Sequence, residues 1–246
     1  MEKQMAERIE GINSIREAIV SGRKIHRIMV ARGASGEGVK TVLTLAREKR
    51  IPIEEVDRGK LDDSGHSQGI VAEGADYRYY EVDDLLKLAA DRGEPPFILL
   101  LDGIEDPQNL GAIIRSAECF GVHGVVIPKH QACAVTPAVS RVSAGAAEHM
   151  RVAQVTNLIP VIEALKKDGL WVVGTDADAD TDLAAFSPPE AAAVVIGSEG
   201  KGMRRLVRER CDFMVKIPLA GRVQSLNASV STAVVLYEIA RHRRKG

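Results

Sequence analysis

The stretch Phe97-Ile-Leu-Leu-Leu-Asp-Gly-Ile-Glu-Asp-Pro-Gln-Asn109 joins an apolar run to a polar turn, and an amphipathic pattern over Leu110–Phe120 follows it. A short, continuous apolar run is typical of a parallel strand that is buried on both faces, and the pattern after it indicates a helix. The stretch therefore predicts a strand, a turn and a helix, the unit from which doubly wound α/β folds are built.

Further apolar runs recur between helical patterns in the same half of the chain, at Val125–Ile127, Trp171–Val173, Ala193–Ile196 and Phe213–Ile217. They predict the remaining strands of one parallel sheet. A last helix is expected over Ala228–Arg243. This half of the chain is therefore predicted to be a doubly wound α/β domain.

The N-terminal part of the chain consists of short alternating elements. We expect helices near Asn13–Ser21 and Val39–Lys49, and strands at Ile25–Ala31, around Ile53–Val56 and at Gln68–Glu73. A polar stretch and a helix over Asp83–Asp91 follow. The predicted organisation is a small α/β domain over residues 1–76, a linker and connecting helix over 77–95, and the larger α/β domain over 96–246.

The composition is that of an ordinary soluble protein, with 45% hydrophobic residues and a formal net charge of −1 over 246 residues. A dedicated nucleic-acid binder usually has a basic excess, so any contact with RNA must come from a local patch. Four basic residues around one predicted strand offer such a patch, although a solvated face would look the same: Arg23, Lys24, Arg27 and Arg32.

Cysteine and histidine usage favours a reduced compartment and no metal. Cys119, Cys133 and Cys211 include no CxxC pair, and the histidines have no metal-ligand spacing. Neither a signal peptide nor an apolar run of the roughly 20 residues that a membrane helix needs is present. We therefore expect a cytoplasmic protein that binds neither metal nor membrane.

The turn after the first strand carries two candidate functional residues, Asn109 and Arg115. The carboxyl end of a strand is where open α/β sheets bind ligands, and a guanidinium offers a planar fork of donors suited to phosphate. The alternative is structural: Asn109 caps the helix and Arg115 pairs with Glu118.

A glycine-rich turn, Ile196-Gly-Ser-Glu-Gly-Lys-Gly202, directly follows another predicted strand. It is not a Walker loop, because glycine rather than serine or threonine follows the lysine, and it lacks the dinucleotide fingerprint. The backbone of this turn could instead contact a cofactor of a different kind, with Glu199 beside that cofactor. The alternative for Glu199 is a helix-capping glutamate.

The third motif is Ile217-Pro-Leu-Ala-Gly-Arg-Val-Gln-Ser-Leu-Asn-Ala-Ser229, which leads from the last strand into the last helix. Asn227 or Ser225 is well placed to cap that helix.

In this order and spacing the three motifs resemble those of the SpoU class of S-adenosylmethionine-dependent RNA ribose methyltransferases, within the SPOUT superfamily. The resemblance implies a deep trefoil knot in the parallel-sheet domain, S-adenosylmethionine as cofactor, and a homodimer whose active site draws on both subunits. Ile25–Ala31 and His66–Ala72 resemble the small RNA-binding domain that precedes the catalytic domain in the RlmB-like branch.

The same resemblance implies the roles of individual residues. The catalytic set is Arg115, Asn109, Glu199, Ser225 and Asn227, and the cofactor-binding set is Thr175, Ile196, Gly197, Gly200, Ile217, Leu219 and Leu226. Proton removal by Arg115 is chemically difficult, because a guanidinium has a pKa above about 12. We therefore expect Arg115 to bind the phosphate beside the target ribose and Glu199 to position Arg115 or the ribose.

The function predicted in this way is 2'-O-methylation of a ribose, on a guanosine, in large-subunit ribosomal RNA. Two alternatives within the enzyme class are a transfer-RNA ribose methyltransferase and a ribosomal-RNA resistance methyltransferase. An alternative of another class is a non-catalytic protein that binds ribosomal RNA during assembly.

Overall fold

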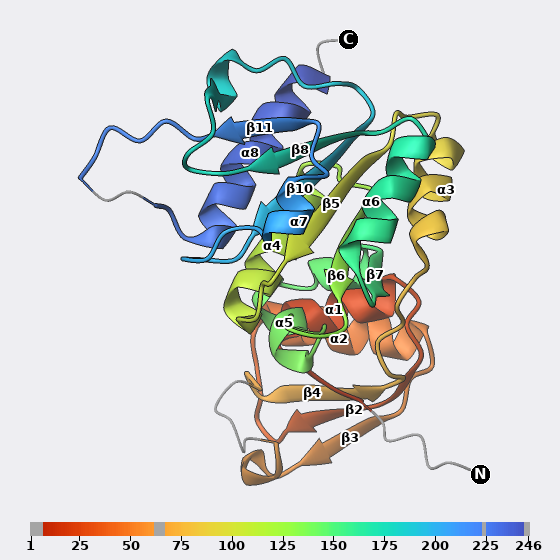
Figure 1. The fold of residues 1–246 in the computed structure, drawn as a ribbon. Helices are drawn as coiled ribbons and strands as arrows, with labels where there is room; N and C mark the ends of the chain where they lie inside the picture. Colours follow the sequence, from red (N-terminus) through yellow and green to blue (C-terminus); the bar gives the residue numbers. More distant parts are fainter. Residues whose placement is uncertain (1–6, 62–66, 223–224, 244–246) are drawn as a thin grey trace. The chain divides into compact units, whose positions relative to one another are not determined.

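The computed structural model describes residues 7–61, 67–222 and 225–243, and Figure 1 shows the path of the chain. His66, Val223 and Gln224, which fall within predicted motifs, lie outside the described residues. The chain divides into two compact units. One comprises residues 1–78 and 135–149, and the other comprises residues 79–134 and 150–246.

The first unit is built on a four-stranded sheet in the order β1-β4-β2-β3. Its strands are β1 (Glu7–Glu10), β2 (Ile25–Ala31), β3 (Ile53–Val56) and β4 (Ile70–Gly74). β2 pairs in parallel with β3 and antiparallel with β4, whose other edge pairs with β1. The ranges predicted for β2 and β3 are confirmed, whereas β1 was not predicted because charged residues dominate its four positions.

Two helices, α1 (Ile12–Val20) and α2 (Glu37–Glu48), cover this sheet. Apolar residues recur on one face of each helix, so both helices bury that face against the strands. The resulting core includes Ile15 and Ile19 of α1, Val39 and Val42 of α2, and Ile28 of β2. The small α/β fold expected for the N-terminal part is therefore present.

A segment from later in the chain, residues 135–149, belongs to this first unit. It forms α5 (Pro137–Val142) and a 3-10 turn, η2 (Ala146–Glu148). The buried Ser14 hydroxyl of α1 donates a hydrogen bond to the Ser140 carbonyl at 3.0 Å, and His149 Nε2 lies 2.8 Å from a Glu17 carboxylate oxygen. The segment follows the first two strands of the larger sheet in sequence, but it packs with the small domain.

The second unit contains a seven-stranded sheet in the order β7-β6-β5-β10-β8-β11-β9, and all of its strand pairs are parallel. Its strands are β5 (Phe97–Asp102), β6 (Gly124–Pro128), β7 (Val152–Val155), β8 (Trp171–Thr175), β9 (Thr181–Asp182), β10 (Ala192–Gly197) and β11 (Phe213–Lys216). The predicted parallel α/β sheet is confirmed. The short strands β7 and β9 were not predicted, because neither stands out as an apolar run.

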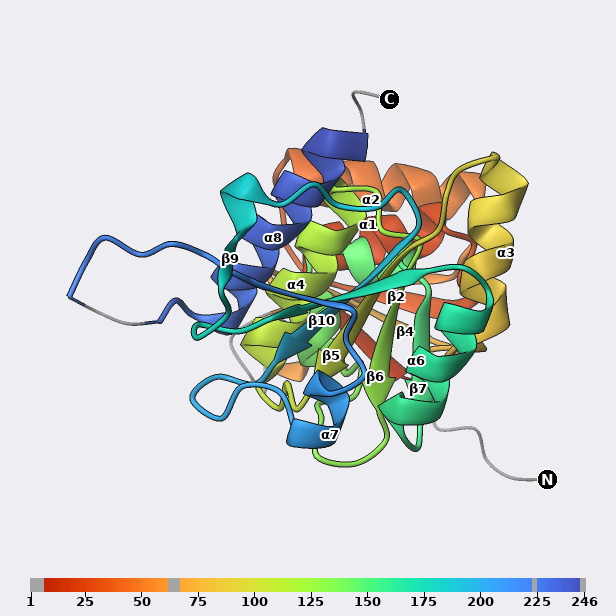
Figure 2. The ribbon, with the colours of Figure 1, turned by 45° about the horizontal axis from the view of Figure 1, so that its top comes forward.

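Helices cover both faces of this sheet (Figure 2). Alternate strand residues such as Ile98 and Leu100 share a core with α3 (Val82–Arg92), α6 (Leu158–Lys167) and α7 (Arg205–Arg208). The helices α4 (Pro107–Cys119) and α8 (Ala228–Arg243) pack against each other on the opposite face. The unit is thus doubly wound, and α8 has the predicted bounds.

The order of the strands decides where a ligand can bind. β5 lies between β6 and β10, and the chain leaves β5 and β10 towards opposite sides of the sheet. Loops that diverge in this way open a crevice at the carboxyl ends of the two strands. The first two motifs of the sequence form these loops. The trefoil threading of the C-terminal segment stays a prediction from the family resemblance.

Candidate functional site

One side chain from each of the three motifs meets at the carboxyl end of the sheet. Asn227 Nδ2 donates a hydrogen bond to Asn109 Oδ1 at 2.9 Å and a longer one to Glu199 Oε2 at 3.4 Å. Asn109 lies in the first turn of α4, and Glu199 lies in the glycine-rich loop after β10. Three segments of the chain, in which Asn227 is 118 residues from Asn109 and 28 residues from Glu199, therefore form one polar cluster, which we call the asparagine cluster.

The other end of the Asn227 amide caps α8. Its Oδ1 accepts hydrogen bonds from the backbone N–H groups of Ser229 at 2.9 Å and Val230 at 3.4 Å. These contacts satisfy helix N-terminal donors and leave the amide nitrogen to face Asn109 and Glu199. Of the two predicted caps for α8, Asn227 is the one found.

The structural alternative for Asn109 is wrong, because Asp106 caps α4. The Asp106 carboxylate accepts from the Gln108 N–H at 3.2 Å, and Pro107 occupies the first helical position. Asn109 is therefore not needed for capping, and its side chain oxygen receives the Asn227 amide instead.

A cavity of about 360 Å³ opens on one side of the asparagine cluster. Its walls come from the ends of β8, β10 and β11, the glycine-rich loop and the start of α8. The predicted catalytic residues Glu199 and Ser225 line it. So do all seven predicted cofactor-binding residues: Thr175, Ile196, Gly197, Gly200, Ile217, Leu219 and Leu226. Sequence reasoning missed Asp176, Asp178 and Lys216, which also line it and carry no motif signal.

The chemistry of this cavity fits a nucleoside attached to a charged amino-acid tail. Leu219 and Leu226 are 40% and 37% exposed, which is unusual for leucine and leaves apolar surface free for a flat base. Asp176 and Asp178 provide carboxylates at the rim, although Asp176 also forms an ion pair with Arg208. S-adenosylmethionine has a purine that matches the apolar surface, and ammonium and sulfonium groups that match the carboxylates.

Close packing fixes the glycine-rich loop. Ser198 and Gly202 exchange two backbone hydrogen bonds, of 3.0 and 2.9 Å. A Cβ on Gly197 would lie only 2.3 Å from backbone atoms of Gly202 and Met203, so no other residue fits there. The buried Asp102 carboxylate holds the far end of the loop, because it accepts hydrogen bonds from the Arg204 N–H and guanidinium at 2.8 and 2.7 Å.

A second, larger cavity of about 660 Å³ lies on the other side of this loop, at the switch point between β5 and β10. Ser198, Glu199, Lys201 and Gly202 line both cavities, so the glycine-rich loop is their common wall. Asn109 lines the second cavity only. The asparagine cluster therefore stands at the boundary between the two.

Among the predicted catalytic residues, Arg115 alone neither joins this cluster nor lines one of the two cavities. It is exposed on α4 and lines neither cavity. Arg115 forms no ion pair among the described residues, so the alternative in which it pairs with Glu118 is not found there.

Two comparisons identify the chain. Residues 96–237 match the SpoU rRNA Methylase family, and residues 8–80 match the family described as RNA 2'-O ribose methyltransferase substrate binding. The chain belongs to the SpoU methylase family. It is accordingly an RNA methyltransferase.

Known relatives cover nearly the whole chain. The "Putative TrmH family tRNA/rRNA methyltransferase YacO" of Bacillus subtilis is 46% identical over 98% of this chain and 97% of its own. The SpoU methyltransferase AviRb of Streptomyces viridochromogenes, solved with AdoMet, is 27% identical with a TM-score of 0.82 over 97% of this chain and 91% of AviRb. An RNA 2'-O ribose methyltransferase structure is 26% identical with a TM-score of 0.81, over 99% and 91% of the two chains.

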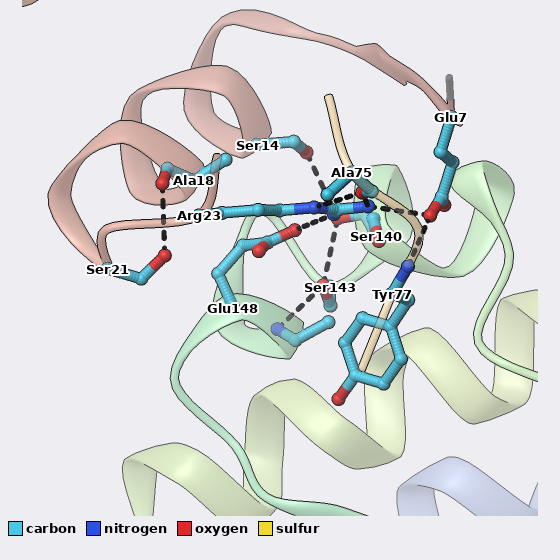
Figure 3. A network of polar contacts seen from close by, with 11 residues as sticks. Glu7, Ser14, Ala18, Ser21, Arg23, Ala75, Tyr77, Ser140, Ser143 and Glu148 are labelled. Atoms are coloured by element: carbon cyan, nitrogen blue, oxygen red, sulfur yellow. Dashed lines mark hydrogen bonds and ion pairs between the residues drawn. The ribbon is translucent and has the colours of Figure 1, made fainter. Parts of the chain in front are cut away.

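Within the SpoU substrate-binding domain, Arg23 does not present its charge to solvent (Figure 3). Its side chain is only 8% exposed and forms ion pairs with Glu7 at 2.6 Å and Glu148 at 2.7 Å, and its guanidinium also donates to the Ala75 carbonyl. Burial raises the pKa of Glu148, which the charge of Arg23 opposes. Arg23 therefore holds the domain together, which no pattern near it in the sequence indicates.

The other three basic residues of the predicted patch are exposed. Arg27 forms hydrogen bonds with Glu73 at 2.8 and 2.9 Å and lies 3.0 Å from Glu54, and the bonds to Glu73 raise the pKa of Arg27. Arg32 lies 3.3 Å from Asp57. Only Lys24 has no ion pair among the described residues, so acidic neighbours offset most of the charge of this patch.

In the described parts of the chain, no group of three or more histidine, cysteine or acidic side chains is arranged to hold a metal ion. In the same residues, no helix combines the length and the apolar character needed to cross a bilayer.

Proposed function

We propose that this protein transfers a methyl group from S-adenosylmethionine to the 2'-hydroxyl of a guanosine in large-subunit ribosomal RNA, as in the RlmB-like branch of the family. The observation that carries the proposal is the asparagine cluster, which brings the three motifs together at the wall between two cavities. One cavity fits the cofactor, and the other is open to a second reactant at the switch point of the sheet.

The cofactor supplies an activated methyl group, carried on a sulfonium cation that loses its charge during transfer. Ile217, Leu219 and Leu226 would provide the apolar surface for the adenine, and Gly197 and Gly200 would let the backbone of the loop approach the cofactor closely. A tight ion pair between Glu199 and the sulfonium would stabilise the ground state and slow transfer. Glu199 instead positions the ribose through its contact with Asn227, since alignment of the reacting atoms dominates such a reaction.

We further propose that the enzyme is a homodimer and that Arg115 serves the active site of the partner subunit. Apolar side chains at helical spacing lie exposed along α8: Val230 at 49%, Val234 at 38% and Tyr237 at 55%. The Tyr237 ring also packs edge-on against Phe120 at the end of α4, the helix that carries Arg115. An apolar face of this kind is typical of a protein interface.

Support for ribosomal RNA comes from the match of residues 96–237 to a family whose description names an rRNA methylase. With ribosomal RNA as its substrate, we propose that the enzyme works in the cytoplasm. Lys24, Arg27 and Arg32 remain the proposed RNA contacts of this domain, and Arg23 is no longer among them. The relative YacO is named for both tRNA and rRNA, so the two substrates must be compared directly.

The test is transfer of labelled methyl from S-adenosylmethionine to unmodified large-subunit RNA, followed by alkaline hydrolysis. A methylated 2'-hydroxyl cannot assist cleavage of the backbone, so a labelled, alkali-resistant dinucleotide is expected and its sequence locates the target. Label in transfer RNA alone would show that the reaction is as proposed but that the substrate is transfer RNA. Label in neither RNA would favour the non-catalytic binding protein.

A further inference from the structure

We infer that the second cavity binds the target nucleotide itself and that His130 and Gln131 contact its base. This inference rests on the proposed function and extends it to the site of the RNA substrate. The cavity adjoins the cofactor cavity across the glycine-rich loop, and Glu199 lines both, so a ribose beside Asn109 and Glu199 would lie next to the cofactor.

The walls of the cavity divide into regions of different chemistry. Lys201 and Arg205 provide positive charge on the side of the glycine-rich loop. Among the residues described, Arg205 is mostly exposed and forms one ion pair, with Glu209 at the end of its own helix, and Lys201 forms none. Both side chains are therefore available to a phosphate.

A second part of the lining follows β6 and carries His130 and Gln131, which are both exposed. The backbone of Gln131 is left-handed, with a φ of 54°, in a residue that has a Cβ. Such backbone conformations gather at ligand sites, where the surroundings hold a side chain in place. An imidazole can stack on a base, and a primary amide can both donate to and accept from a base edge.

The wall after β5 carries Glu105 and Asp106. One oxygen of Asp106 caps α4, whereas Glu105 is exposed and has no polar contact among the described residues. Carboxylates only accept hydrogen bonds at neutral pH, so this wall favours a base edge rich in donors. The Watson–Crick edge of guanine, with its N1–H and amino group, is such an edge.

The experiment follows the histidine side chains by NMR in the full-length protein with S-adenosylhomocysteine present. The sequence has six histidines, and His130→Ala assigns the resonance of His130. We expect 5'-GMP at millimolar concentration to shift this resonance and saturate, with 5'-CMP and 5'-dGMP binding more weakly. We expect Gln131→Gly to weaken 5'-GMP binding about fivefold to tenfold, the effect of one lost hydrogen bond.

The matched control is Arg50→Gly, because Arg50 has a similar left-handed φ of 56° and lies in the other unit. It should leave 5'-GMP affinity unchanged, and both variants should bind S-adenosylhomocysteine normally. The inference would be overturned if 5'-GMP did not shift the His130 resonance, or if Gln131→Gly bound 5'-GMP as tightly as the wild-type protein. The same shift with inorganic phosphate alone would also overturn it.

The outcomes also separate this inference from the proposed function. Saturable 5'-GMP binding at His130 without methyl transfer to either RNA would keep the nucleotide site and overturn the methyltransferase reaction. Methyl transfer to ribosomal RNA, with no shift of the His130 resonance and no effect of Gln131→Gly, would keep the methyltransferase reaction and overturn the nucleotide site.

Discussion

Asn227 shows how one side chain can serve both stability and activity. Its carbonyl oxygen caps α8, and its amide nitrogen donates to Asn109 and Glu199. The two ends of an amide differ in hydrogen-bonding character, so a substitution can separate the two roles.

Asn227→Asp should keep the helix cap and lose the donor. A second carboxylate would then face the Asn109 oxygen and Glu199, and we expect methyl transfer to fall strongly with little loss of stability. Asn227→Ala should lose the cap as well and lower the free energy of unfolding by about 1 kcal/mol. Urea unfolding and the methyl-transfer assay measure the two effects, and full activity in Asn227→Asp would contradict the role of the donor.

Arg115→Ala should abolish methyl transfer while S-adenosylmethionine still binds. The reason is that Arg115 lines neither cavity of its own chain, so its contribution lies with the RNA or with a partner subunit. Titration calorimetry of the variant checks the prediction. Lost cofactor affinity would remove the assigned role.

The glycine-rich loop after β10 is shaped by packing at Gly197. Gly197→Ala places a methyl group 2.3 Å from the backbone of Gly202 and Met203, and the loop must move. We expect a loss of about 1–3 kcal/mol in the free energy of unfolding and weakened cofactor binding. Gly59→Ala is the control, since a Cβ there meets no atom within 4 Å, and it should change neither quantity.

A buried histidine joins the beginnings of β5 and β6. His123 Nδ1 accepts the Phe97 N–H at 3.0 Å, and its Nε2 lies 3.0 Å from Glu94. Burial lowers the pKa of His123 below 6.5, because a charged ring is poorly solvated there, and the contact with Glu94 only partly opposes this. Protonation would also remove the acceptor for Phe97.

Stability should therefore decrease as the pH falls below about 6.5, because the unfolded chain binds a proton that the folded chain does not. His123→Asn retains an acceptor and cannot be protonated in this range. Its free energy of unfolding should fall less steeply with acid, by up to about 1.4 kcal/mol per pH unit. Equal slopes for the two proteins between about pH 6.5 and 5 would show that His123 is not responsible.

The proposed dimer makes a prediction about the whole assembly. Val234→Glu puts a charge in the middle of the exposed apolar face of α8, so we expect monomers and a loss of methyl transfer. Val20→Glu is the control, because Val20 is more exposed than Val234, at 57% against 38%, but lies on α1. Sedimentation velocity measures the state of each variant, and a monomeric wild-type protein would contradict the proposal.

Local patterns of sequence were sufficient to predict five of the seven strands of the parallel sheet and the bounds of α8, whereas the cofactor-binding residues were expected only from the resemblance of the motifs to a known family. These features depend on runs of apolar residues and on loops at strand ends, which neighbouring residues specify. The role of Arg23 could not be predicted in this way, because its partner Glu148 is 125 residues away. The packing of residues 135–149 with the small domain, and the second cavity beside the first, likewise arise only from contacts between distant segments, and folding alone creates these contacts.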